Sequence, residues 1–238
     1  MSRPHIAPCQ FLPRLHLFAE LAPDRIAAIA AATTGLHATR GQLIFERGAP
    51  CTGIHAVIYG DVKLSVASPE GDEKVVDLIG PGQSLGEAPL FMERSYIASA
   101  EALDDCLLLH IDRAAIFDEV ERDPRFARRL LAGMGRRLHG LIADVESYTL
   151  RSASQRIAGY LLKDDPQQGA QINFAACKKM IASRLNLTPE YFSRVLHEMA
   201  GRGMVGIAGR NVTILDVAGL RAWEGWAGLQ QAPAGSAP

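Results

Sequence analysis

Three polar side chains in one short segment are suited to reading the edges of DNA base pairs. Glu190, Ser193 and Arg194 are interspersed with apolar residues at helical spacing. An arginine can donate two hydrogen bonds to guanine O6 and N7, a glutamate accepts from cytosine N4, and a serine can contact several base edges. The sequence therefore predicts that this segment binds double-stranded DNA sequence-specifically.

Two helices joined by a tight turn are needed to present these side chains. The pattern predicts a first helix from Lys178 to near Asn186. A second helix begins after Thr188, a strong N-cap, with Pro189 in its first position. Ala182 is small enough to let the helices cross closely. The second helix is predicted to bury Phe192, Val195, Leu196 and Met199. This is the helix-turn-helix arrangement, whose second helix enters the major groove.

Neighbouring residues complete the predicted DNA surface. Thr188 and Tyr191 lie at the start of the second helix, and residues 203–215 are predicted to form a β-hairpin wing. Three basic residues are placed for phosphates, which position a protein without reading sequence: Lys178, Lys179 and Arg210 at the wing tip. The alternative is a packed helical hairpin of an enzyme, but the cap, the turn, the small residue and the wing coincide here.

The distribution of charge also points to a polyanionic partner for the C-terminal part. Residues 151–238 carry ten Lys and Arg against six Asp and Glu, a net charge of +4, while residues 1–150 carry −5. The 238 residues are 48% hydrophobic and 21% charged, which is ordinary globular composition. We find no apolar run long enough to span a membrane and no secretion signal.

Four cysteines are scattered without CxxC spacing: Cys9, Cys51, Cys106 and Cys177. This spacing disfavours both a disulfide framework and a four-thiolate metal site. A reduced, cytoplasmic setting is the natural interpretation.

Short strand-like runs separated by glycines fill residues 36–111. Such runs at regular spacing predict an antiparallel barrel or sandwich. Residues 13–33 before it are predicted to form short helices, the last of which runs to Gly35. The predicted strands are Gln42–Phe45, His55–Tyr59, Val62–Val66, Val75–Ile79, Tyr96–Ala100 and Cys106–Ile111.

After residue 112 the pattern becomes helical and carries a long apolar seam. Its members alternate at spacings of four and three residues, which predicts two long helices paired in a homodimer. The alternative is a helix packed on its own domain, because Phe126, Leu130 and Ile142 widen the apolar stripe. Ala127 begins the seam, and the predicted dimer interface comprises Leu131, Met134, Leu138, Leu141, Val145 and Tyr148.

These elements predict an α+β protein with three structured parts. They are a β-barrel sensor domain (residues 1–120), a dimerisation helix (121–150) and a winged helix-turn-helix domain (151–227). Arg151–Ser154 is predicted to be a hinge. Residues 228–238 are predicted to be a disordered tail.

Residues 13–225 resemble the CRP/FNR family of bacterial transcription regulators. The resemblance rests on the barrel glycines, the segment Gly82–Ala88, the long helix and the helix-turn-helix. It implies an N-terminal double-stranded β-helix, a jelly-roll barrel of cyclic-nucleotide-binding type. It also implies a dimer that recruits or blocks RNA polymerase.

The recognition helix narrows the resemblance further. Glu190, Ser193 and Arg194 are similar to the triad of FNR-type proteins, which implies a palindromic site resembling TTGAT-N4-ATCAA. Residues 181–190 and the pair Glu87-Ala88 most resemble the Dnr subgroup. That likeness implies nitric oxide sensing through haem b.

The predicted effector pocket lies between the barrel and the long helix. Gly86-Glu87 and Arg94-Ser95 resemble the cassette of cyclic-nucleotide receptors, but the spacing between Glu87 and Arg94 is shorter than in cyclic AMP receptors. Leu141 and Ile142 stand where those receptors place hydroxyl residues against adenine, which disfavours cyclic AMP. The predicted pocket residues are Leu85, Gly86, Glu87, Pro89, Leu90, Phe91, Arg94, Ser95, Leu138, Leu141 and Ile142.

Haem needs an apolar slot and an axial donor, which is usually histidine. His16, which matches a histidine of the Dnr proteins, and His139, beside Leu138, are the candidate ligands. The alternative for each is an ordinary structural histidine. An iron–sulfur cluster is disfavoured because Cys9 lacks the neighbouring cysteines that such a cluster requires.

No catalytic residues and no metal site are predicted. The sequence lacks a nucleophile–base–acid set, a P-loop and a metal-binding motif. The remaining alternatives are a cyclic-nucleotide-responsive regulator and a nucleotide-regulated subunit of an enzyme.

Overall fold

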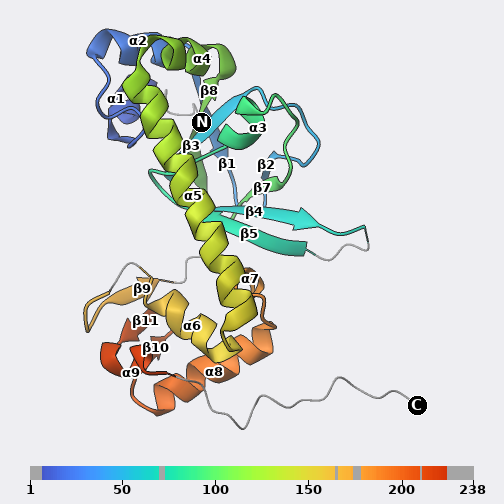
Figure 1. The fold of residues 1–238 in the computed structure, drawn as a ribbon, viewed down its shortest axis with the longest axis vertical. Coiled ribbons are helices and arrows are strands. Elements are labelled where there is room, and N and C mark those ends of the chain that lie inside the picture. Colours follow the sequence, from blue (N-terminus) through green and yellow to red (C-terminus); the bar gives the residue numbers. More distant parts are fainter. Residues whose placement is uncertain (1–6, 70–72, 164–165, 174–177, 210, 224–238) are drawn as a thin grey trace. The chain divides into compact units, whose positions relative to one another are not determined.

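The computed structural model describes residues 7–69, 73–163, 166–173, 178–209 and 211–223 (Figure 1). Contacts divide the chain into two compact units, Met1–Leu141 and Ile142–Pro238. This division lies inside the long helix, before the boundary predicted at residue 150. Arg210 and the predicted tail at 228–238 lie outside the described residues. In the described part of the chain, no helix is long and apolar enough to cross a membrane.

Two four-stranded antiparallel sheets build the first unit. One has the strand order β1-β8-β3-β6 and the other β2-β7-β4-β5. Strands from the two ends of the segment pair directly, because Thr33 lies opposite Ile111 and Ala38 opposite Cys106. The predicted barrel is confirmed. Its strands are β1 (Thr33–Ala38), β2 (Leu43–Phe45), β3 (Gly53–Tyr59), β4 (Val62–Ala67), β5 (Glu73–Ile79), β6 (Ser84–Leu85), β7 (Ser99–Ala102) and β8 (Cys106–Asp112).

Strand β1 corrects one sequence prediction. The helix expected to run to Gly35 ends at Ala31, and a strand begins at Thr33. Thr33 and Thr34 are β-branched, and both pair with residues of β8. The strand propensity of the two threonines and their pairing with β8 favour a strand here. Together they outweigh the alanine-rich helical pattern of the residues before Thr33.

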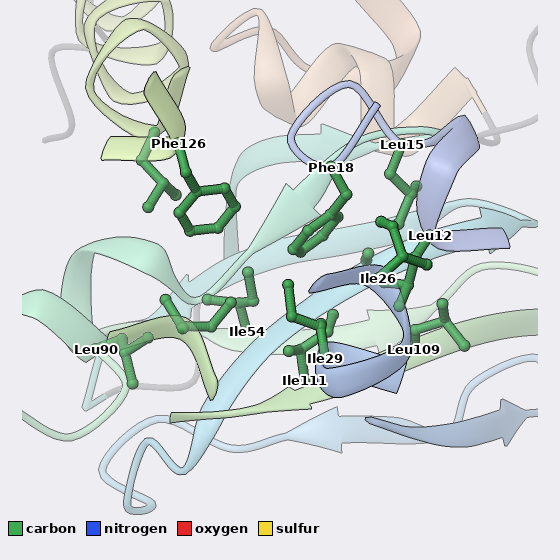
Figure 2. Close-up of a cluster of buried hydrophobic side chains, with 13 residues drawn as sticks. Leu12, Leu15, Phe18, Ile26, Ile29, Ile54, Leu90, Leu109, Ile111 and Phe126 are labelled. Carbon is green, nitrogen blue, oxygen red and sulfur yellow. The ribbon is translucent and has the colours of Figure 1, made fainter. Parts of the chain in front are cut away.

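The sheet that contains β3 and β8 separates two hydrophobic clusters. Leu108 belongs to the cluster inside the barrel, and its neighbour Leu109 to the cluster on the other face, as the alternation of a strand requires. The outer cluster is covered by helices. Within it the rings of Phe18 and Phe126 lie 5.7 Å apart, between centroids (Figure 2).

Short helices cover this outer face. They are α1 (Pro8–Phe11), the 3-10 helix η1 (Leu12–Arg14), α2 (Pro23–Ala31), α3 (Glu87–Phe91) and α4 (Arg113–Arg122). Asp112 caps α4 by accepting a 2.8 Å hydrogen bond from the Ala114 amide. An ion pair of 2.6 Å joins Arg25 of α2 to the buried Glu119 of α4.

The long helix α5 (Pro124–Leu150) begins in the core of the first unit. Phe126 and Leu130 are buried there. Arg129 donates to the Leu17 carbonyl and to Glu20. The first turns of α5 are therefore fixed to the segment between η1 and α2.

The second unit contains the end of α5 and a winged helix-turn-helix. Ser152 caps α6 with a capping box to Gln155, so the predicted hinge at Arg151–Ser154 holds the start of a helix. The predicted two-stranded wing has a third strand, β9, which pairs with β11. The elements are α6 (Ala153–Leu161), β9 (Gln171–Asn173), α7 (Lys178–Arg184), α8 (Pro189–Gly201), β10 (Val205–Ala208), β11 (Asn211–Ile214) and α9 (Val217–Arg221).

Candidate nucleic-acid interface and effector site

The turn between α7 and α8 has the geometry that the sequence predicted. Helix α7 ends at Arg184, and Asn186 takes a left-handed conformation with φ of 56°. The Leu187 amide returns to the Ala182 carbonyl at 2.8 Å, which closes the helix end. Thr188 then caps α8 by accepting a 3.2 Å hydrogen bond from the Tyr191 amide.

Helix α8 has one buried and one outward face. Phe192, Val195, Leu196 and Met199 are all buried, as expected. Glu190 and Arg194 are exposed, and Ser193 is half-buried. The guanidinium of Arg194 lies over the ring of Tyr191, 4.9 Å from its centroid. The predicted base-reading residues therefore share the solvent-facing side of the first turns of α8.

Of the three predicted phosphate contacts, two lie at the start of α7, and the third, Arg210, lies outside the described residues. Lys178 and Lys179 form the first turn of α7, where Lys179 is exposed. Gly209 marks the tip of the wing with φ of 61°. Backbone amides and lysine ammonium groups of this kind bind phosphates without selecting a sequence.

In the first unit, a buried carboxylate sits at the start of α3. Gly86 precedes it with φ of 100°, and a side chain there would meet the Gly53 carbonyl at 3.2 Å. Glu87 is 7% exposed. Its Oε2 lies 3.3 Å from Nη1 of Arg137, a residue of α5.

Arg137 binds three groups of the barrel at once. Besides Glu87, it donates a 2.9 Å hydrogen bond to the Ser84 carbonyl and lies 3.7 Å from the Asp77 carboxylate. Neither Arg137 nor Asp77 was among the pocket residues predicted from the sequence. A signal was present, because Arg137 precedes the predicted pocket residue Leu141 by four residues, one helical turn.

The other predicted pocket residues are not gathered around one cavity. Leu85 belongs to the cluster inside the barrel and Leu90 to the outer cluster, and both are 1% exposed. In α3, Pro89 is buried and Phe91 is half-buried against the outer cluster. After this helix, Arg94 and Ser95 are exposed. Leu138 and Leu141 are exposed on α5, and Ile142 belongs to the second unit.

Neither of the two histidines predicted to bind haem lies in an apolar pocket. His16 and His139 are both exposed. The apolar residues expected to line a porphyrin slot are either packed in hydrophobic cores or exposed on α5. In addition, the Glu87–Arg137 pair joins α5 to the barrel, where the slot was expected. These residues do not fit a haem in this conformation.

The predicted dimer seam is a row of exposed apolar side chains on α5. Leu131 is 67% exposed, Leu138 61% and Val145 61%, while Leu141 is also exposed and Met134 is half-buried. Tyr148 differs, because its hydroxyl donates to the Arg184 carbonyl of the same chain.

Comparisons with known proteins agree with this architecture. Residues 36–123 match the cyclic nucleotide-binding domain family, and residues 155–223 match the Crp-like helix-turn-helix domain family. The chain is 30% identical over 202 residues to the cyclic AMP receptor protein of Thermus thermophilus, covering 85% of this chain and 93% of that protein. It is 24% identical over 213 residues to a CRP-like cAMP-activated global transcriptional regulator of Mycobacterium tuberculosis, covering 87% and 95%.

The fold is also found in FixK2 from Bradyrhizobium japonicum. That structure superposes with a TM-score of 0.74 at 22% identity, covering 82% of this chain and 98% of the other. The relatives named here are regulators and not enzymes, in agreement with the sequence analysis. The chain is a member of the CRP/FNR family of DNA-binding transcription regulators.

Proposed function

We propose that this regulator is a homodimer that reads a palindrome of the form TTGAT-N4-ATCAA. The observation that carries the proposal is the outward side of α8. There, Glu190, Ser193 and Arg194 follow a capped start whose apolar face is fully packed. The carboxylate of Glu190 can accept a hydrogen bond from cytosine, and the hydroxyl of Ser193 can contact thymine or adenine. The guanidinium of Arg194 can donate to guanine.

Dimerisation through α5 would give the two recognition helices the spacing of a palindrome. Half-sites one helical turn apart require recognition helices about 34 Å apart. The exposed apolar row from Leu131 to Val145 supports this role, since a lone helix would leave it in water. The dimer would act in the cytoplasm by recruiting or blocking RNA polymerase.

Binding to labelled duplexes tests the site. Arg194→Ala should weaken binding to the TTGAT duplex by about 1–3 kcal/mol per half-site and remove discrimination at the guanine. Lys179→Ala is the matched control. It should weaken binding to all sequences equally and reduce the number of ions released on binding by about one per half-site. Unchanged binding of Arg194→Ala to the palindrome would refute the assignment.

We further infer that the effector is a polar molecule with hydroxyl and anionic groups, as a nucleotide has. Glu87 is a buried hydrogen-bond acceptor, and Arg137 is a cation that already lies in the same place. Arg94 adds an exposed guanidinium at the end of the cassette. This proposal replaces the haem expected from the Dnr resemblance, because the candidate histidines are exposed.

Two measurements distinguish these effectors. Titration calorimetry with cyclic AMP and cyclic GMP should give heats of binding that Glu87→Gln abolishes. An absorption spectrum after addition of haem, with and without nitric oxide, should show no stoichiometric complex. A haem spectrum that responds to nitric oxide and is lost in His16→Ala would contradict the polar effector.

A further inference from the structure

The last two turns of α5 belong to the DNA-binding unit and not to the barrel. The division of contacts falls between Leu141 and Ile142, so residues 142–150 are counted with the helix-turn-helix. Two side chains in this segment, Asp144 and Tyr148, lie one helical turn apart and therefore point to the same side of α5. Both contact the same residue of α7.

The first contact closes the end of α7. The Tyr148 hydroxyl donates a hydrogen bond to the carbonyl of Arg184, the last residue of α7. Carbonyls in the last turn of a helix have no partner within the helix and need one from elsewhere. Tyr148 provides that partner from α5.

The second contact fixes the side chain of the same residue. Nη2 of Arg184 lies 3.1 Å from the Asp144 carboxylate, and the Arg184 side chain is 13% exposed. A charge-assisted hydrogen bond with little exposure is less screened than a surface pair. Arg184 is therefore attached to α5 through both its backbone and its guanidinium.

A third residue supports Tyr148 from α6. The guanidinium of Arg156 lies over the Tyr148 ring, 5.9 Å from its centroid. Burial lowers the pKa of Arg156, and the Tyr148 and Tyr191 hydroxyls oppose that shift. Arg156 is thus near both the end of α5 and the first turn of α8.

The attachment point is next to the recognition helix in the chain. Between Arg184 and the cap residue Thr188 runs a closed turn, held by the Leu187–Ala182 hydrogen bond and the left-handed Asn186. Short connections between two helices adopt only a few conformations, so the end of α7 and the start of α8 have little freedom to move independently. The orientation of α8 therefore depends on where α5 holds Arg184.

We propose that Tyr148, Asp144 and Arg184 are positioning residues for DNA recognition, which fasten the end of α5 to the turn before the recognition helix. They act through the placement of Glu190, Ser193 and Arg194. This role adds to the proposed function and does not depend on which sequence or effector the protein recognises.

The test compares DNA binding by full-length variants that lose single groups. The probes are a duplex that the unmodified protein enriches from a randomised pool and a scrambled duplex of equal length. Tyr148→Phe and Asp144→Asn should each weaken binding to the enriched duplex by about 3- to 10-fold. Binding to the scrambled duplex, which depends on phosphate charge, should change by less than about twofold.

Matched controls remove similar groups elsewhere in the same unit. Thr149→Val removes a hydroxyl that, in the described part of the chain, bonds only within α5, to Val145 and Glu146. Glu198→Gln removes the carboxylate of an exposed pair with Arg202. Both should bind the two duplexes as the unmodified protein does. The double variant Asp144→Asn/Arg184→Leu should be no weaker than Arg184→Leu alone, because the two residues share one interaction.

Hydrogen exchange distinguishes positioning from general stability. Amides of residues 185–188 should exchange faster in Tyr148→Phe, while those of β3 and β8 in the barrel should be unchanged. Equal losses on both duplexes, or wild-type affinity in Tyr148→Phe and Asp144→Asn, would overturn the proposal. Unchanged exchange at residues 185–188 would overturn it as well.

Discussion

At the level of single residues, His55 of β3 is a buried histidine in an aromatic environment. Its side chain is 6% exposed and lies among Phe45, Tyr96 and His110. Within the described part of the chain, its Nδ1 has no hydrogen-bond partner. Burial, assisted by the charge of His110, lowers the pKa of His55 to about 3.

This environment predicts a loss of stability in acid. The unfolded chain binds a proton at His55 below about pH 6.5, whereas the folded state resists it down to about pH 3. The contribution of neutral His55 is therefore complete above pH 6.5. Between pH 6.5 and 3 it is lost at up to about 1.4 kcal/mol per pH unit.

Denaturant titrations at several pH values measure this slope. His55→Phe should reduce the slope of stability against pH by the equivalent of about one proton, because the titrating group is removed. Phenylalanine keeps an aromatic ring in the cluster around Phe45. His139→Phe, at an exposed position of α5, is the control and should keep the wild-type slope. Identical slopes in wild type and His55→Phe would show that His55 is not the responsible group.

At the scale of elements, the start of α8 determines how the reading residues are presented. Thr188→Ala removes the cap that accepts from the Tyr191 amide and should cost about 1 kcal/mol of stability. Thr188→Ser keeps the hydroxyl and should therefore keep the stability of the unmodified protein. Thermal unfolding monitored by circular dichroism compares the three proteins, and equal midpoints for Ala and Ser would contradict the role of the cap.

Glycines in α5 and in the barrel should respond to alanine in opposite ways. In the single chain nothing described lies within 4 Å of a side chain added at Gly140. Gly140→Ala should therefore stabilise the helix by about 0.5–1 kcal/mol. At Gly60, with φ of 81°, the added carbon would lie 2.5 Å from Cys106 Sγ. Gly60→Ala should cost about 1–3 kcal/mol. Chemical denaturation measures both, and two changes of the same sign would refute this account.

At the scale of the whole molecule, the exposed row on α5 predicts the oligomeric state. Leu138→Asp combined with Val145→Asp places two carboxylates in the seam and should produce monomers. Affinity for a palindrome should fall by roughly 10²-fold or more, because the second half-site is then no longer tethered.

Analytical ultracentrifugation measures this outcome directly. Ala143→Asp introduces the same charge on an exposed part of α5 outside the seam and should leave the mass unchanged. A dimer that persists in the double variant would place the interface elsewhere on the protein.

The features that depend on neighbouring residues could be predicted from the amino-acid sequence. Thr188 and Pro189 mark the start of α8. The spacing of Phe192, Val195 and Met199 predicts the buried face of this helix. Glu190 and Arg194 then lie on the opposite, exposed face. Caps, turns and helical periodicity depend on neighbouring residues, so a single segment contains the whole signal. Five of the six predicted barrel strands were located for the same reason, whereas the predicted strand Tyr96–Ala100 is wrong at both ends, because β7 runs from Ser99 to Ala102.

The features that join distant segments became known only from the folded chain. Thr33 and Thr34 became a strand because β8 lies beside them, and β9 was ordered by β11. The contacts of Arg137 with Glu87 and Asp77, and of Tyr148 with Arg184, bring together residues that are far apart in the chain. The periodicity of a sequence cannot predict such pairs, because their free energy is gained only after the chain has closed the intervening loops.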